Sequence, residues 1–304
     1  MPDNPTPRRP AAGAALAFHR AVVLLAAHNP AATTAVDPSG IEWIDMPVPV
    51  PTMSGLHVPS SSTAAGALHR LSRAFWARGT PWSISVIGPV PEVVTDLAGD
   101  GGFVERREPT LTVGLQSEAF STPTGPEYHL FVEDEEHRRQ WTTTCETGFG
   151  LPAGTAGSIL TPELMASGVV RPVLASRDGI PVATALAVLN GDGWLGLFCV
   201  ATVAGARRSG VAERLVRSVL HRGRDWGAHT AYLRSTEMAR PLYQGLGFVD
   251  SRDDTTYFIA RSPEAQEVGR RPANPSGARD ARSFPATGPA AEEPTSLGRA
   301  RGAG

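Results

Sequence analysis

Cysteine is scarce in this chain, and its two cysteines, Cys145 and Cys199, are too few for a disulfide framework. No group of cysteines and histidines has the spacing of a zinc site, so no metal site is expected. Aromatic residues make up 7% of the sequence, and none forms the aromatic and basic platform that single-stranded nucleic acids require. These shortages argue against a disulfide-rich domain, a zinc module and a nucleic-acid binder.

Neither sign of charge is in excess, because 28 basic and 30 acidic residues leave a formal charge of −2. This balance argues against a general nucleic-acid or membrane binder. No apolar run approaches the ~20 residues that a membrane-spanning helix needs. Arg8 and Arg9 precede an alanine-rich stretch, as in an export signal, but His19 and Arg20 interrupt the apolar run. We therefore expect a cytoplasmic protein.

The length of 304 residues suggests two domains, and 41% apolar residues can supply their cores. Turn residues over 121–126 indicate the boundary. From about residue 261, Pro, Gly, Ala, Arg and Glu dominate, a composition that cannot bury enough apolar surface to order the chain. The predicted division is an N-terminal α/β domain over 1–125, a second domain over 126–262 and a disordered tail over 263–304.

Hydrophobic periodicity predicts the elements of both domains. In the first domain we expect helices over 14–28 and 62–77 (the second capped by Ser62), a short helix over 91–97, strands over 82–87, 103–105 and 111–115, and an irregular connection over 47–60. In the second we expect helices that start at Asp134 and Thr161 and helices over 210–225 and 238–246. The expected strands cover 128–132, 170–176, 181–189, 194–202, 229–235 and 257–260.

The stretch from Trp194 to Ala212 dominates this pattern. An apolar strand ends at Thr202, a loop of small residues and arginines follows, and a helix then begins with an apolar stripe of Leu215, Val216, Val219 and Leu220. The first amides of a helix lack internal partners and carry partial positive charge, so they bind anions. Gly210 lets a ligand approach the backbone, and the Arg207 and Arg208 side chains suit phosphate oxygens. Cys199, inside the strand, is expected to be a buried small apolar residue.

The loop alone is a loose pattern. It is not a P-loop, because no Gly-Lys-Ser/Thr follows the glycine, and it lacks the three spaced glycines of a Rossmann fingerprint. A more specific sign lies downstream, in Ala239-Arg240-Pro241-Leu242-Tyr243-Gln244-Gly245-Leu246-Gly247-Phe248. Together with the loop, this segment resembles the GNAT superfamily of acetyl-CoA-dependent N-acetyltransferases, whose signatures are Arg/Gln-x-x-Gly-x-Gly/Ala and Ala-x-x-Leu-Tyr-x-x-x-Gly-Phe. The resemblance covers about residues 128–260.

The resemblance implies an α+β fold with a mixed, mostly antiparallel twisted sheet flanked by helices. The N-terminal third is similar to the degenerate first half of two-domain members. The resemblance places acetyl-CoA along the strand and loop, with no metal. The implied coenzyme-binding residues are Val200, Ala201, Thr202, Arg207, Arg208, Ser209, Gly210, Val211 and Ala212.

Tyr243 stands where the family commonly has the general acid that reprotonates the departing thiolate. The residues depart from the family pattern at Ala204, where proline is frequent, and at Thr236, where asparagine is frequent. The strand from Trp194 to Thr202 carries no acid, so no general base is assigned. Glu237 and Asp192 flank the region and are expected to be solvated surface charges.

The implied function is direct transfer of an acetyl group from acetyl-CoA to a primary amine, on a small molecule or a peptide N-terminus. The alternative is a non-catalytic acyl-CoA-binding or sensor module of the same fold, which the missing base favours. The sequence leaves the acceptor and the oligomeric state open.

Overall fold

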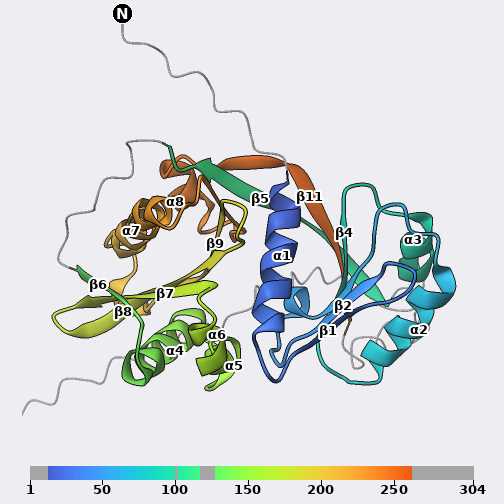
Figure 1. Ribbon diagram of the computed structural model, residues 1–304, viewed down its shortest axis with the longest axis horizontal. Coiled ribbons are helices and arrows are strands. Elements are labelled where there is room, and N and C mark those ends of the chain that lie inside the picture. Colours follow the sequence, from blue (N-terminus) through green and yellow to red (C-terminus); the bar gives the residue numbers. More distant parts are fainter. Residues whose placement is uncertain (1–12, 100–101, 117–126, 262–304) are drawn as a thin grey trace, which may run out of the picture. The chain divides into compact units, whose positions relative to one another are not determined.

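Helices and strands alternate through the part of the chain that this computed structural model describes, residues 13–99, 102–116 and 127–261 (Figure 1). The helices are α1 (Ala14–Ala27), α2 (Ala65–Trp76), α3 (Glu92–Gly99), α4 (Glu135–Phe149), α5 (Thr155–Ile159), α6 (Pro162–Ala166), α7 (Val211–Asp225) and α8 (Arg240–Gly245). The strands are β1 (Thr33–Val36), β2 (Glu42–Asp45), β3 (Gly55–His57), β4 (Ser83–Ile87), β5 (Phe103–Gly114), β6 (Glu127–Phe131), β7 (Val170–Arg177), β8 (Ile180–Leu189), β9 (Trp194–Thr202), β10 (Thr230–Leu233) and β11 (Val249–Ala260).

All of these strands join one sheet in the order β1-β2-β3-β4-β11-β5-β10-β9-β8-β7-β6. Neighbouring strands run antiparallel except at β3–β4 and β9–β10, which are parallel and are each joined through a helix. The predicted fold class, an α+β fold with a mixed and mostly antiparallel sheet flanked by helices, is confirmed.

The order of elements occurs twice. The series β1-β2-β3-α2-β4-α3-β5 has the same succession of strands and helices as β7-β8-β9-α7-β10-α8-β11. The last strand of each series lies beside the other series, because β11 pairs with β4 and β5 pairs with β10. These two strands also pair with each other along most of their length. The two series therefore share one sheet.

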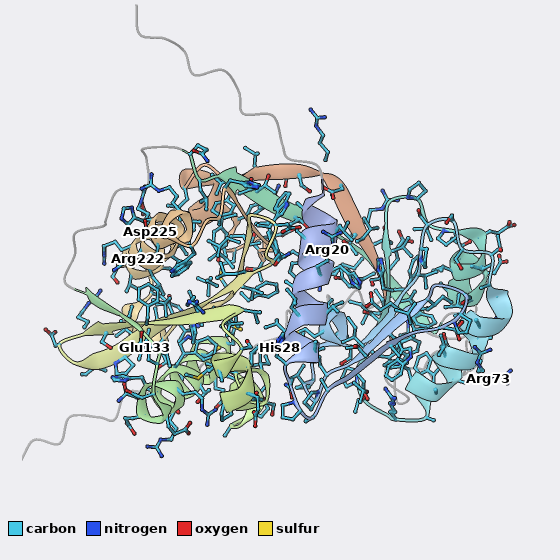
Figure 2. The ribbon with its side chains drawn as sticks, in the orientation of Figure 1. Arg20, His28, Arg73, Glu133, Arg222 and Asp225 are labelled. Carbon is cyan, nitrogen blue, oxygen red and sulfur yellow. The ribbon has the colours of Figure 1, made fainter. Side chains whose placement is uncertain are left out.

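Alternating side chains of the sheet pack against different helices. On β8, Ala183, Ala185 and Ala187 pack with α7, whereas Leu186 and Val188 pack with α1 and α4. In Figure 1, α7 and α4 accordingly lie on opposite sides of β7 and β8. The predicted stripe of α7 is confirmed, since Leu215, Val216, Val219 and Leu220 are all buried. Arg222 and Asp225, in the last turn of α7, are exposed (Figure 2).

Two predicted helix starts are confirmed by their caps. The Asp134 carboxylate accepts a hydrogen bond from the His137 amide at 2.8 Å and opens α4. The Thr161 hydroxyl accepts one from the Leu164 amide at 3.2 Å, with Pro162 in the first turn of α6. These caps satisfy amides that have no partner inside the helix.

Three predictions for the N-terminal third are wrong. Residues 103–105 and 111–115 are not separate strands, because β5 is continuous and its two ends pair with β11 and β10. The connection over 47–60 contains β3, where Gly55 crosses so close to β4 that a Cβ would lie 1.8 Å from the Ser83 carbonyl oxygen. Ser62 does not cap α2, which begins at Ala65. Strands β1 and β2 were not predicted.

The predicted linker over 121–126 and the predicted tail over 263–304 lie outside the described residues. The proposed boundary after residue 125 falls in the same gap and stays a prediction. Among the residues that are described, none of the helices combines the length and the apolar character needed to cross a bilayer.

Candidate active site

Strands β9 and β10 run side by side for only three residues. Thr230, Ala231 and Tyr232 pair with Trp194, Leu195 and Gly196, and no further pair follows. Strand β9 continues to Thr202, paired only with β8. Within the described chain, the backbone of residues 197–202 therefore has an unpaired edge on the side of β10. An unpaired edge offers amide and carbonyl groups to a ligand.

A β-bulge lies in this unpaired part of β9. The pairing with β8 shifts register between Thr184 and Leu186, and Cys199 opposite has a φ of 49°. The Thr184 hydroxyl donates to the Cys199 carbonyl at 2.9 Å and holds the bulge. Bulges change the direction in which the following residues present their groups. Val200, Ala201 and Thr202, the residues implied to bind the pantetheine arm, come directly after it.

Helix α4 packs closely on the same part of β9. A Cβ added to Gly148 would lie 2.8 Å from the Ala201 Cβ and 3.2 Å from the Thr202 amide nitrogen. Cys145, one turn earlier on α4, is hydrogen-bonded to the thiol of Cys199, and this bond and burial raise the pKa of the Cys199 thiol. The raised pKa keeps the Cys199 thiol protonated, which argues against a role as nucleophile. Cys199 is only partly buried, so the prediction of a buried residue is wrong.

The turn into α7 leaves a row of amides without partners. Arg208 and Gly210 both have left-handed backbone conformations, with φ of 62° and 78°. The first helical bond runs from the Arg214 amide to the Gly210 carbonyl at 3.1 Å. In the described chain, the backbone amides of residues 208–213 donate to no other group. Amides of this kind at a helix start form an anion site.

Arginine side chains surround the turn, but Arg207 is already committed. Its guanidinium donates to the Thr202 carbonyl at 3.1 Å and to the Gly148 carbonyl at 2.9 Å, which ties the loop to β9 and α4. Its role in these contacts is to position the turn. Arg208, the neighbouring predicted phosphate ligand, is exposed.

Two further arginines reach Ser209 and were missed by the sequence analysis. Arg214 donates to the Ser209 carbonyl at 3.0 Å, and Arg177, from the end of β7, donates to the Ser209 hydroxyl at 3.0 Å. The four-residue spacing from Gly210 to Arg214 on a helix could have revealed the first. No signal in the sequence brings Arg177 to this turn, because only the sheet places β7 there.

Tyr243 lies on α8, 5% exposed, in the same packed cluster as Val211 and partly buried Val200. Its ring meets Phe248 edge-on at 5.8 Å. The hydroxyl has no hydrogen-bond partner in the described chain, yet it is not among the side-chain atoms that are completely enclosed. Burial raises the pKa of Tyr243 to about 12, so the hydroxyl is protonated at neutral pH.

Acidic groups are absent from the described surface of β9. Asp192, in the hairpin before the strand, pairs with Arg20 at 3.1 Å, and Glu237 is exposed in the loop after β10. Both occupy the surface positions that were expected. No group of three or more potential metal ligands occurs among the described residues.

In the first series, the parallel strands do not separate as β9 and β10 do, so that series has no opening like the one where β9 and β10 part. Its parallel pair β3–β4 stays joined to the end of β3, and the Val58 amide still donates to the Ser85 carbonyl at 2.9 Å. The segment from there to α2, residues 59–64, contains neither glycine nor arginine. The features of the turn at residues 203–210 are therefore not repeated there.

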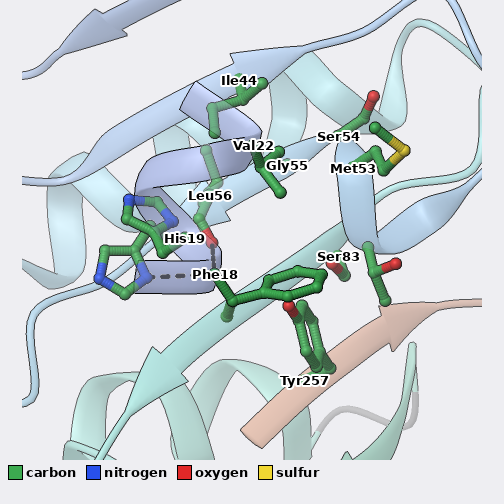
Figure 3. Close-up of a pocket in the computed structure, with 13 residues that line it drawn as sticks. Phe18, His19, Val22, Ile44, Met53, Ser54, Gly55, Leu56, Ser83 and Tyr257 are labelled. Atoms are coloured by element: carbon green, nitrogen blue, oxygen red, sulfur yellow. Dashed lines mark hydrogen bonds between the residues drawn. The ribbon is translucent and has the colours of Figure 1, made fainter. Parts of the chain in front are cut away.

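A small pocket lies between α1, β3, β4 and β11 (Figure 3). His19 and His57 stack on one of its sides with ring centroids 3.9 Å apart, and His19 contacts the Glu42 carboxylate at 2.6 Å. Burial lowers the pKa of His57 to about 4. The rings of Phe18 and Tyr257 form the opposite side in the same view.

Residues 162–248 match the model of the acetyltransferase (GNAT) family. The fold is similar to a GCN5-related N-acetyltransferase from Kribbella flavida, with a TM-score of 0.63, 18% identity, and 84% and 98% of the two chains covered. A GCN5-related N-acetyltransferase from Sphaerobacter thermophilus has a TM-score of 0.53 and 17% identity, with 76% of this chain and 81% of that chain covered. A tandem GNAT protein from the clavulanic acid biosynthesis pathway has a TM-score of 0.52 and 13% identity, with 84% of this chain and 98% of that chain covered. No curated protein matches this chain in sequence.

Proposed function

Because the chain contains a GNAT acetyltransferase domain at residues 162–248, we propose that it transfers an acetyl group directly from acetyl-CoA to a primary amine. The observation that carries this proposal is the row of unpartnered amides over 208–213 beside the unpaired edge of β9. A cytoplasmic location, and a small amine or peptide N-terminus as acceptor, belong to the same proposal.

The turn before α7 would hold the diphosphate of the coenzyme. The backbone N–H groups from Arg208 to Ala212 would donate hydrogen bonds to the diphosphate oxygens, and the helix dipole adds to the attraction. The arginines at positions 177 and 214 contribute positive charge around the Ser209 peptide. Gly210 has no side chain of its own, and the Arg214 guanidinium lies beside it, with Nη1 2.7 Å from where a Cβ would be.

The pantetheine arm and thioester would pair with β9 along its unpaired edge, at Val200, Ala201 and Thr202. Backbone amides beside the carbonyl can stabilise the oxyanion of the tetrahedral intermediate, a contribution worth about 3–4 kcal/mol. Holding amine and thioester together contributes a further ~7–11 kcal/mol in favourable cases. Positioning by the backbone thus supplies much of the catalysis.

Tyr243 would return a proton to the departing thiolate. A tyrosine with a pKa of about 12 is a weaker acid than the free side chain, so it gives its proton less readily to a thiolate in water. A thiolate that departs into the same apolar surroundings is also desolvated, which raises its proton affinity in parallel. The transfer therefore depends on exclusion of water from the opening. No residue is proposed as the general base.

A non-catalytic acyl-CoA-binding module is the second candidate function. It is favoured by the absence of an acid from β9. Release of free thiol from acetyl-CoA across a panel of amines separates the two functions. Turnover with any amine supports the enzyme, whereas tight coenzyme binding without turnover supports the module.

The coenzyme site is tested by charge at Ala212, in the first turn of α7. Aspartate there suits the helix dipole but repels a diphosphate, so Ala212→Asp should keep the thermal stability and weaken acetyl-CoA binding by about tenfold or more. Ala212→Ser is the matched neutral control. Isothermal titration calorimetry with acetyl-CoA measures both, and equal affinity in the aspartate variant would exclude this turn as the site.

A further inference from the structure

A buried arginine lies at the carboxyl end of β10, beside the opening. Arg234 follows the last residue of that strand, and its side chain is 10% exposed. The guanidinium carbon lies 3.8 Å from the centre of the Phe18 ring and 4.9 Å from that of Tyr257. Two aromatic rings, one from α1 and one from β11, therefore hold the guanidinium.

The hydrogen bonds of this guanidinium are incomplete. Nη1 donates to the Tyr257 hydroxyl and Nη2 to the Thr255 hydroxyl at 2.7 Å, but Nε is buried without a partner. The neighbouring Ser235 hydroxyl is also buried and unpartnered. Arginine keeps its proton, and a buried donor without an acceptor is costly and rare. An acceptor supplied by a ligand would satisfy Nε.

Arg234 is close to the strand that would hold the thioester. The Phe18 ring that covers the guanidinium also packs on Phe198, with ring centroids 5.1 Å apart. Phe198 directly precedes the bulge at Cys199. The Phe18 ring thus contacts both the Arg234 guanidinium and a residue of β9.

The charged groups near Arg234 do not fully neutralise it. The Glu108 carboxylate lies 3.6 Å from Arg234 and 3.5 Å from Arg106, so two cations share it. Asp253, an acid on β11, accepts through Oδ2 from two amides at the start of α1 at 3.0 and 3.1 Å, and its Oδ1 is buried without a partner. Its charge is therefore matched by a helix N-terminus. Among Arg106, Arg234 and Glu108, positive charge exceeds negative charge by one.

Building on the proposed function, we propose that the acceptor amine carries a carboxylate, as an amino acid does, and that Arg234 binds this carboxylate. Nε and Nη2 lie along one edge of the guanidinium and give the two parallel donors that a carboxylate accepts. Nη2 has a second hydrogen besides the one given to Thr255. Arg234 is then the residue that determines acceptor specificity.

The wild-type protein tests this with matched pairs of acceptors. Glycine, β-alanine, 4-aminobutyrate and the proteinogenic L-amino acids are each compared with their amides, by calorimetry on the CoA complex and by thiol release from acetyl-CoA. The chain contains no lysine, so its own side chains add no acceptor amine. At least one acid should exceed its amide about tenfold in affinity or in kcat/KM. The proposal would be overturned if no acid binds, or if in every pair the amide equals or exceeds the acid in affinity and in kcat/KM.

Substitution at Arg234 gives the second test. Arg234→Gln should bring each acid to within about twofold of its amide, because an amide has no carboxylate for Arg234 to bind and the acid loses that contact. Arg234→Lys keeps the charge without the fork and should recover part of the preference. Arg70→Gln, which breaks an exposed ion pair with Asp37, is the control. Preference for acids retained in Arg234→Gln would exclude Arg234 as their ligand.

Two readouts keep the outcomes distinct. Thermal melting shows whether each variant folds. If Arg234→Gln does not fold, the comparison of acids with amides on the wild-type protein still tests the proposal. Absence of acetyl-CoA binding would contradict the proposed function. Coenzyme binding without any preference for acids would contradict only the role of Arg234.

Discussion

The hydroxyl of Tyr243 lies in apolar surroundings and makes no hydrogen bond in the described chain. The hydroxyl of Tyr232, on β10, is 3.0 Å from the Ala17 carbonyl and 2.9 Å from the Asn190 side chain. Burial raises the pKa of both groups. Only Tyr243 keeps its proton and lone pairs available to a ligand, and this difference separates a candidate acid from a structural tyrosine.

Substitution of each tyrosine by phenylalanine should therefore have opposite effects. Tyr243→Phe is expected to lower kcat about a hundredfold, with acetyl-CoA affinity and stability nearly unchanged, because the general acid is lost. Tyr232→Phe should cost about 1 kcal/mol of unfolding free energy with little effect on kcat. Steady-state kinetics, calorimetry and urea denaturation measure these quantities. Full turnover in Tyr243→Phe would remove it from the acid role.

The sequence placed arginines at the turn before α7 but did not predict where their side chains point. Arg207 was predicted to face phosphate, and its guanidinium instead bonds two backbone carbonyls. Arg177 lies 32 residues before Ser209 and reaches its hydroxyl. A long, flexible side chain can point in several directions from the same backbone position, so the contacts are decided by the neighbours that folding brings near.

Among the elements, the contact of α4 with β9 is the closest to the proposed thioester. Gly148 faces Ala201 with no room for a methyl group, so α4 can approach the strand after its bulge. The Arg207 side chain adds a hydrogen bond from the turn before α7 to the carbonyl of Gly148. Displacement of this helix should therefore disturb both the strand and the turn.

Two glycine-to-alanine substitutions in helices test this contact. Gly148→Ala should destabilise the protein by about 1–3 kcal/mol, since the new methyl would lie 2.8 Å from the Ala201 Cβ, and should weaken acetyl-CoA binding. Gly157→Ala, on α5 with open space around its Cβ position, should stabilise by about 0.5–1 kcal/mol. Chemical denaturation measures both. Stabilisation by Gly148→Ala would show that the helix does not depend on this close approach.

At the scale of the whole molecule, the exchange of β5 and β11 joins the two series of strands. Each strand belongs to one series by sequence and pairs with the other. Neither series then completes its own sheet alone, and helix α1 packs on strands of both. The two series are expected to unfold together, although the sequence suggests two domains.

Calorimetry should thus show one thermal transition, with a ratio of calorimetric to van't Hoff enthalpy of about 1. Leu68→Ala, a core substitution in α2, should lower the midpoint of that whole transition, since such changes cost about 2–5 kcal/mol. Acetyl-CoA should raise the same midpoint. Two separate transitions, with only one moved by Leu68→Ala, would contradict this coupling.

The sequence by itself determined the strand, turn and helix over residues 194–225, because apolar periodicity and a glycine with positive φ act within a few residues of one another. Two short segments, each with a local structural reason, also pointed to the acetyltransferase (GNAT) family, whose model matches residues 162–248. Only the tertiary structure decided that β9 and β10 separate after Gly196, that Arg177 reaches Ser209 and that Arg234 lies between Phe18 and Tyr257. Those relations join residues far apart in the chain, and they are set by the register and order of strands in the shared sheet, which no local pattern encodes.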